Sequence, residues 1–252
     1  MRRPLTLGIE APDGRAGLAH FVEHMMFNGS KHAAGKFMDF VQQAGANLAE
    51  GGVNGTTNHD RTNYFESVPP QNLEHILWLE SDRLATLPEV LTVQRLEAER
   101  EIIKNERRQR IEGRPYGRAE TLMVQNVFRA PHPYSHDVLG NPDDLMAIDV
   151  GDMTEFFNTY YTPNNLSLVI AGDFDPAKQV VTNATLLGSI NNQAQYPFAW
   201  QSSGCALITL PLKQPITSGK SLEVDVFVGP NYDLQSRSTL SHDSSGGGPP
   251  AP

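Results

Sequence analysis

Apolar residues recur at helical spacing along residues 16–27, and this pattern predicts a helix that buries one stripe of its surface. The stripe consists of Leu18, Phe21, Val22, Met25 and Met26. An adjacent stripe carries His20, Glu23, His24 and Phe27. We therefore expect a helix whose packed face lies beside a face of ionisable side chains.

The same spacing predicts further helices at residues 35–43, 73–84, 92–111, 116–128 and 153–161. Alternating or continuous apolar residues predict strands at 62–68 and 166–171, with shorter ones at 206–210 and 222–228. Residues 51–58 are rich in Gly, Asn and Thr, and by themselves they predict a polar loop. Long helices with a few strands are typical of the α+β fold class.

The pattern changes after about residue 185. Residues 186–230 form a divergent C-terminal segment, in which the two short strands are separated by Pro, Gly and Ser. Residues 231–252 include a run of Ser, Gly and Pro and predict a disordered tail.

The formal net charge of −9 argues against a nucleic-acid partner, because binding a polyanion requires a basic face. The arginines of residues 107–110 lie among glutamates and predict a solvated helix face of mixed charge. The composition, 39% hydrophobic and 19% charged, is typical of soluble globular proteins. Membrane insertion is not expected, since apolar stretches such as 166–171 are far shorter than the roughly 20 residues of a membrane-spanning helix.

The start of the chain leaves the compartment open. Residues 1–4 are basic, but no apolar run follows them, so no secretory signal is visible. We expect a cytoplasmic protein from the chain as given, and a periplasmic one if the true N-terminus carries an export signal.

Cys205 is the single cysteine, which excludes an internal disulfide and every cysteine-based zinc site. A metal would have to be bound by His and carboxylate. In a helix, residues four apart lie on one face, so His20 and His24 can bind one ion. Glu23 lies near such an ion without ligating it, which is where a general base for a zinc-bound water belongs.

A catalytic zinc needs a third protein ligand and an open position for water. The apolar face of the predicted helix at 92–111 is set by Val93, Leu96, Ile102 and Ile103. At about 100° per residue, Glu99 and Glu106 project toward this face, whereas Glu97 and Glu101 point roughly to the other side. Because a buried carboxylate is costly unless it is paired or binds a metal, we interpret Glu106 as a ligand and Glu99 as its supporting partner.

A simpler interpretation stays open for the same residues. His20 and His24 would then be surface or hydrogen-bonded core histidines, and the carboxylates would pair with arginines of the same helix: Arg95, Arg100 or Arg110.

Around these residues the sequence resembles the pitrilysin/insulinase/processing-peptidase family, the inverzincins, whose signature is H-x-x-E-H. The likeness extends over residues 8–182. It is carried by GLAHFVEHMMFNGS at 17–30, NGTT at 54–57, DRTNYFE at 60–66, KNERRQ at 104–109, HPY at 132–134 and GDF at 172–174.

The resemblance implies an α+β metalloenzyme module of bacterial type, with a mixed, mostly antiparallel sheet packed against helices. Residues 1–185 would be the catalytic-type peptidase domain, a single module truncated at its N-terminus, because residues 5–9 offer less strand than the family's module begins with. Active members carry a second, similar domain that completes the active-site chamber. Residues 186–252 are too short and too unlike it, so a second domain or partner chain would have to complete the chamber.

The resemblance also implies a zinc-dependent endopeptidase that hydrolyses extended peptides. One Zn²⁺ ion would be bound by His20, His24 and Glu106, with Glu23 as the base that activates the zinc-bound water and Glu99 supporting the site. Family substrates add as a strand to a sheet edge, which implies that substrate binds along Asn54, Gly55, Thr56 and Thr57. The alternative is a non-catalytic or incomplete peptidase-like module that needs a partner chain for activity.

Overall fold

The computed structural model describes residues 12–162, 165–171, 206–209 and 222–228. The α-helices in this part are α1 (Leu18–Met25), α2 (Phe37–Gln43), α3 (Leu73–Val90), α4 (Val93–Arg107), α5 (Ala119–Val127), α6 (Pro142–Ala147) and α7 (Val150–Tyr160). Four short helical turns are η1 (Leu48–Glu50), η2 (Pro70–Asn72), η3 (Arg108–Glu112) and η4 (Pro133–Ser135). The strands are β1 (Val53–Thr57), β2 (Thr62–Val68), β3 (Leu166–Ala171), β4 (Ala206–Thr209) and β5 (Leu222–Val228).

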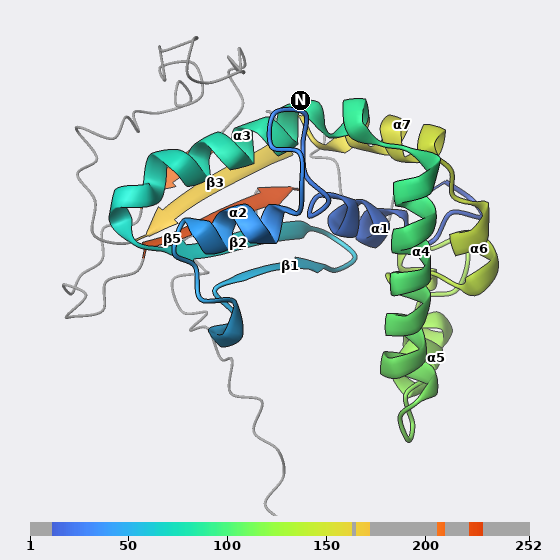
Figure 1. Ribbon diagram of the computed structural model, residues 1–252. Coiled ribbons are helices and arrows are strands. Elements are labelled where there is room, and N and C mark those ends of the chain that lie inside the picture. Colours follow the sequence, from blue (N-terminus) through green and yellow to red (C-terminus); the bar gives the residue numbers. More distant parts are fainter. Residues whose placement is uncertain (1–11, 163–164, 172–205, 210–221, 229–252) are drawn as a thin grey trace, which may run out of the picture.

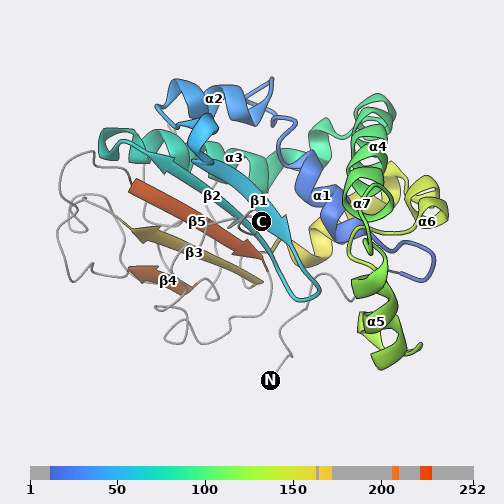
Figure 2. The same ribbon diagram turned by 90° about the horizontal axis from the view of Figure 1, so that it is seen from below.

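The described strands form one mixed sheet in the order β1-β2-β5-β3-β4. Strand β3 pairs in parallel with β4, and every other pairing is antiparallel. Figure 1 shows α3 running along the sheet, and Figure 2 shows the helices from α4 to α7 gathered at one end of it. The α+β class with a mostly antiparallel sheet is therefore confirmed. The C-terminal segment predicted as divergent supplies β5, which lies between β2 and β3.

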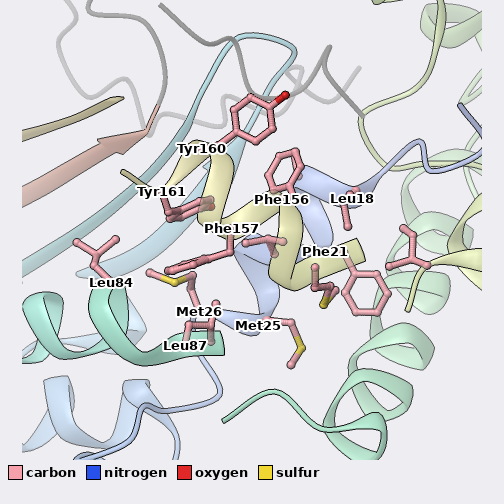
Figure 3. Close-up of a cluster of buried hydrophobic side chains, with 14 of the residues drawn as sticks. Leu18, Phe21, Met25, Met26, Leu84, Leu87, Phe156, Phe157, Tyr160 and Tyr161 are labelled. Carbon is pink, nitrogen blue, oxygen red and sulfur yellow. The ribbon is translucent and has the colours of Figure 1, made fainter. Parts of the chain in front are cut away.

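Helix α1 lies in the centre of the larger hydrophobic core. Phe21 and Met26 are fully buried, and the whole predicted apolar stripe joins the cluster. Figure 3 shows side chains of α7 and α3 packed against α1, among them Phe157 from α7 and Leu87 from α3. Because each such side chain contributes about 1.5–3 kcal/mol when fully buried, the contacts hold α1 firmly at the end of the sheet.

The start of α1 depends on a glycine. Gly17 has a φ of 94°, a left-handed conformation that side chains disfavour. A Cβ at this position would also lie 2.8 Å from the Cα of Gly140. The close crossing of these two backbone segments fixes where α1 begins.

A second buried group ties α3 to the sheet. Arg83 of α3 is fully buried, and its Nη2 donates a hydrogen bond of 3.0 Å to Glu66 of β2. Its Nε donates to Glu80, one turn earlier on α3, at 3.1 Å. The guanidinium lies 3.7 Å from the ring centroid of Phe37 and 4.7 Å from that of Tyr64. Charge pairing and cation–π contacts thus offset the desolvation of this arginine.

The predicted apolar face of helix α4 is wrong in part. Leu96 and Ile103 are buried, but Val93 is 67% exposed and Ile102 is 50% exposed. The buried face includes Arg100 instead, whose guanidinium donates hydrogen bonds to the backbone carbonyls of Leu145 and Ile148. These carbonyls at the end of α6 need donors, so Arg100 sets the rotation of α4.

Three other expectations are corrected. Residues 51–58 are not a polar loop, because Val53–Thr57 form strand β1 by pairing with β2. The predicted helix at 92–111 is not uniform, since α4 ends at Arg107 and a π-helical turn, η3, follows it. The solvated face expected around residues 107–110 also fails for Arg107, whose side chain is only 11% exposed because it faces the loop at residues 135–141.

The other predicted helices and strands form, but α3 continues to Val90, beyond the expected end at residue 84, and α6 was not predicted. The strands at 62–68, 166–171 and 222–228 have the expected bounds. In the described residues, no helix is both long and apolar enough to cross a membrane. The expected N-terminal strand at 5–9, Cys205, the tail at 231–252 and most of the segment at 186–230 lie outside the described residues.

We predict that Arg83→Met lowers the free energy of unfolding by about 3–5 kcal/mol, because Glu66 and Glu80 would stay buried without their cation. Urea unfolding followed by circular dichroism measures the change. Lys31→Met is the control, since Lys31 and Glu89 form an ion pair in which both side chains are about half exposed. It should cost less than about 1 kcal/mol. Equal losses in the two variants would contradict the role of Arg83.

Candidate metal centre

Helix α1 presents both predicted histidine ligands on one side. His20 is 5% exposed and His24 is half-buried, and their ring centroids lie 4.7 Å apart. The spacing of four residues produces this proximity, as expected for one turn of helix. The two rings meet at 78°, so they are not stacked, and their nitrogens face the end of α4.

Glu106, near the end of α4, supplies a third donor atom. Its Oε2 lies 3.1 Å from Nε2 of His24 and 3.6 Å from Nε2 of His20. All three donor atoms lie within 4.8 Å of one another. A tetrahedral zinc with bonds of about 2.0–2.1 Å separates its ligand atoms by about 3.3 Å. The donor set and its spacing therefore fit a zinc ion.

Glu99 lies outside the set of three donor atoms, on the other side of the His24 ring. Its Oε2 is 3.3 Å from Nδ1 of His24, the ring nitrogen opposite the one that faces Glu106. Its Oε1 accepts a hydrogen bond of 2.9 Å from Asn28. Glu99 thus orients the His24 ring from behind, which is the arrangement that carboxylates adopt beside metal-binding histidines.

Glu23 lies beside the donor atoms without joining them. The side chain is 7% exposed, and its Oε2 accepts a hydrogen bond from the hydroxyl of Thr57 on β1. A Cβ on Gly55 would lie 2.9 Å from the other carboxylate oxygen, Oε1. A side chain at position 55 would crowd Glu23 and the ring of Phe27, and glycine lets the backbone of β1 approach Glu23 without displacing them.

Burial and neighbouring charges shift the pKa values of the two histidines in opposite directions. Burial, assisted by the charge of His24, lowers the pKa of His20 to about 4, which keeps its ring neutral and able to ligate. Burial also lowers the pKa of His24, but hydrogen bonds to Glu106 and Glu99 outweigh it and raise the pKa to about 9. Without a metal, His24 therefore holds a proton between two carboxylates, and a divalent ion would replace that proton.

The pKa values of Glu106 and Glu23, the two carboxylates beside the histidines, are also shifted in opposite directions. The hydrogen bond to His24 holds the pKa of Glu106 below its usual range, so that carboxylate is ionised. Burial raises the pKa of Glu23 despite the opposing hydrogen bond from Thr57. A raised pKa brings a carboxylate closer to neutral pH, where general bases are most effective.

All the residues predicted to bind substrate line the same pocket as the donor atoms. The pocket has a volume of about 620 Å³, and β1 forms one of its walls. Along β1, Asn54 and Thr56 are exposed while Gly55 is buried. In the described part of the chain β1 pairs with β2 alone, so its other edge is open. An open edge offers backbone N–H and C=O groups to an added strand.

Two contacts at the site did not follow from the sequence: the hydroxyl of Thr57 contacts Glu23, and Asn28 contacts Glu99. A third contact joins Arg110 to Glu106 at 2.9 Å. It is one of the carboxylate–arginine pairs that the simpler interpretation allowed, and the spacing of four residues is its signal. The contact between Thr57 and Glu23 joins a strand to a helix, and no local pattern indicates it.

Two family models match this chain. The model described as "Insulinase (Peptidase family M16)" matches residues 9–135, and the model described as "Peptidase M16 inactive domain" matches residues 147–231. The chain belongs to the insulinase family, peptidase family M16. Its first match contains α1, β1 and α4 and therefore every residue of the metal centre, while the second crosses the domain boundary predicted at residue 185.

Bacterial M16 proteins are among its relatives. The chain is 30% identical over 166 residues to "Zinc protease PqqE" of Helicobacter pylori, a match that covers 66% of this chain and 36% of the relative. It is 30% identical over 184 residues to "Probable zinc protease PqqL" of Escherichia coli, covering 68% of this chain and 18% of the relative. The chain thus spans little more than a third of the first relative and less than a fifth of the second.

Solved structures of this family share the fold. The crystal structure of a protease from Helicobacter pylori matches with a TM-score of 0.53 and 28% identity, covering 62% of this chain and 36% of that one. The periplasmic protease PqqL from Escherichia coli matches with a TM-score of 0.53 and 25% identity, covering 63% of this chain and 17% of that one.

We predict that the purified chain binds one equivalent of zinc and that His24→Ala weakens binding at least 100-fold, because a ligand and the link to Glu99 are both lost. Elemental analysis and competition with a chromogenic chelator measure stoichiometry and affinity. His75→Ala is the matched control, since His75 is exposed on α3, away from the converging donor atoms. Equal affinity of His24→Ala and the parent would contradict the site.

Proposed function

We propose that this chain is the zinc-binding module of a metalloendopeptidase that hydrolyses extended peptides. The observation that carries the proposal is the convergence of His20, His24 and Glu106 on one point, with Glu23 beside it and outside the donor set. A paired-carboxylate or structural role for the same residues does not require a base in this position. The names of the M16 relatives, which describe zinc proteases, agree with it.

The residues of the chain divide the chemistry among them. A bound zinc ion would supply Lewis acidity, polarising a peptide carbonyl and lowering the pKa of water. Glu23 would take up the proton of the attacking water and later deliver it to the leaving amine. The Thr57 hydroxyl would hold the Glu23 carboxylate in place during both transfers. Glu99 would keep the His24 ring oriented.

The open edge of β1 would hold the substrate. A peptide added there as a strand hydrogen-bonds through its backbone, so affinity depends little on its sequence. Because Gly55 lies against Glu23, a peptide bond on this edge would pass beside the proposed base. Asn54 and Thr56 are exposed along the same strand and line the pocket.

A periplasmic location is proposed for this chain from one relative. The solved structure of PqqL from Escherichia coli is that of a periplasmic protease. An exported precursor would place this chain in the same compartment, where a peptidase of this type would meet extended peptides.

We predict that Glu23→Gln lowers kcat for a fluorogenic peptide by about 10²–10⁴-fold, because the amide cannot accept the proton. Its zinc content should equal that of the parent, since Glu23 is not among the converging donor atoms. The control Glu101→Gln alters an exposed carboxylate of α4 that pairs with Lys104, and it should leave both quantities unchanged. Full activity of Glu23→Gln would overturn the mechanism.

A second function has its own support: an incomplete module that binds zinc but turns over only beside a partner. The matches cover 36% of PqqE and 18% of PqqL, so most of each relative lies outside them. Size-exclusion chromatography of the tagged chain purified from its own cells, with peptide hydrolysis assayed in every fraction, separates the two. The second function predicts activity in those fractions alone that contain a second protein. Hydrolysis by a lone monomer would exclude this second function.

A further inference from the structure

The two oxygens of Glu106 have different partners. Oε2 faces the histidines, at 3.1 Å from His24 and 3.6 Å from His20. Oε1 lies 2.9 Å from Nη2 of Arg110. The carboxylate is thus held from both sides, and its orientation determines which oxygen can face an ion.

Arg110 lies in an unusual stretch of helix. Helix α4 ends at Arg107, and η3 continues it as a π-helical turn, closed by a hydrogen bond from the Gly113 N–H to the Arg108 carbonyl. A π turn takes more residues than an α turn, and it returns Ile111 to the buried side. Arg110, one residue earlier, consequently projects toward the pocket that contains Glu106.

Other cations on the same helix do not share this placement. Lys104 pairs with Glu101, whose side chain is 60% exposed, and Arg108 donates a hydrogen bond of 2.8 Å to Asn105. The partner of Arg110 is a carboxylate whose side chain is only 19% exposed. Pairs of the first kind contribute little, whereas a cation beside a desolvated carboxylate acts through a less polar medium.

We propose that Arg110 is a positioning residue that fixes the rotation of the Glu106 carboxylate and so leaves a single oxygen, Oε2, to bind the metal. The inference rests on the proposed zinc site and deepens it. With Oε1 held by Arg110, the carboxylate contributes one donor atom, and the fourth position of a tetrahedral ion stays open. Without Arg110 the carboxylate could rotate or offer both oxygens.

Arg110 and Thr57 also line a second pocket, next to the proposed site. The side chain of Arg110 is 61% exposed, so Arg110 holds Glu106 through one nitrogen while most of its surface stays open to the pocket. The contact with Glu106 therefore costs little burial of the guanidinium, and removing it should not disturb the core.

The test measures zinc affinity of the complete chain by competition with a chromogenic chelator. Arg110→Gln should raise the dissociation constant about 10–100-fold, the range found when the outer partner of a metal ligand is removed. Arg110→Lys keeps the charge, and its affinity should lie between those of the parent and the Gln variant. A Lys variant that binds no better than the Gln variant would count against the proposal.

Arg108→Gln is the matched control, because it removes the same charge from the same turn without touching Glu106. Its zinc affinity should stay within about twofold of the parent, as expected for a solvent-screened charge. Equal weakening in the two glutamine variants would show that the effect does not depend on contact with Glu106, and it would overturn the proposal. Unchanged affinity in Arg110→Gln would overturn it as well.

Thermal unfolding in the presence of EDTA separates positioning from folding. The zinc-free parent and Arg110→Gln should unfold at the same temperature; a lower temperature for the variant would assign the loss of affinity to instability and contradict the proposal. If the parent itself took up no zinc, the proposed function would fail. If the parent binds zinc and Arg110→Gln binds it equally well, only the role of Arg110 fails.

Discussion

Enclosure of helix α1 is the constraint on which the rest of the structure depends. Strands β1 and β2 and helices α4 and α7 all contact this short helix, so its ionisable residues are desolvated together with its apolar ones. A buried ionisable group is tolerated only with partners, and two of these elements supply them. Strand β1 supplies the Thr57 hydroxyl for Glu23, and α4 supplies Glu99 and Glu106 for His24. The buried ionisable side chains of α1 need these partners, and pairing with them brings the residues of the proposed metal site together.

The orientation of α4 follows from a polar contact as well as from its buried apolar residues, Leu96 and Ile103. Arg100 is almost fully buried because it satisfies two carbonyls at the end of α6. That contact turns Ile102 toward the pocket and Val93 toward solvent, while Glu99 and Glu106 face α1. Arg83 acts similarly in α3, where it links Glu66 of the sheet to the ring of Phe37 on α2. Two buried arginines therefore position the helices around the site.

The fold and the site differ in how much of the chain they need. The donor atoms and the base come from residues 20–106, within the match to the insulinase model. The sheet that carries β1 also needs residues 222–228, because β5 joins β2 to β3 and is part of the second match. A strand contributed from so late in the chain supports the edge along which a substrate would add. The proposed metal site needs residues of the first half of the chain alone, whereas the proposed substrate edge belongs to a sheet that also includes residues 222–228.

The sequence by itself determined the helix of His20, Glu23 and His24, the strands at 62–68, 166–171 and 222–228, and the inward direction of Glu99 and Glu106. These follow from periodicity, which local backbone geometry imposes. Only the tertiary structure decided that residues 53–57 form a strand, that Arg100 rather than Ile102 is buried, and that Thr57 contacts Glu23. A Gly- and Asn-rich segment becomes a strand only when a partner strand takes its hydrogen bonds, and a buried arginine is stable only where distant carbonyls accept its donors. Such partners lie far along the chain, where no local pattern records them.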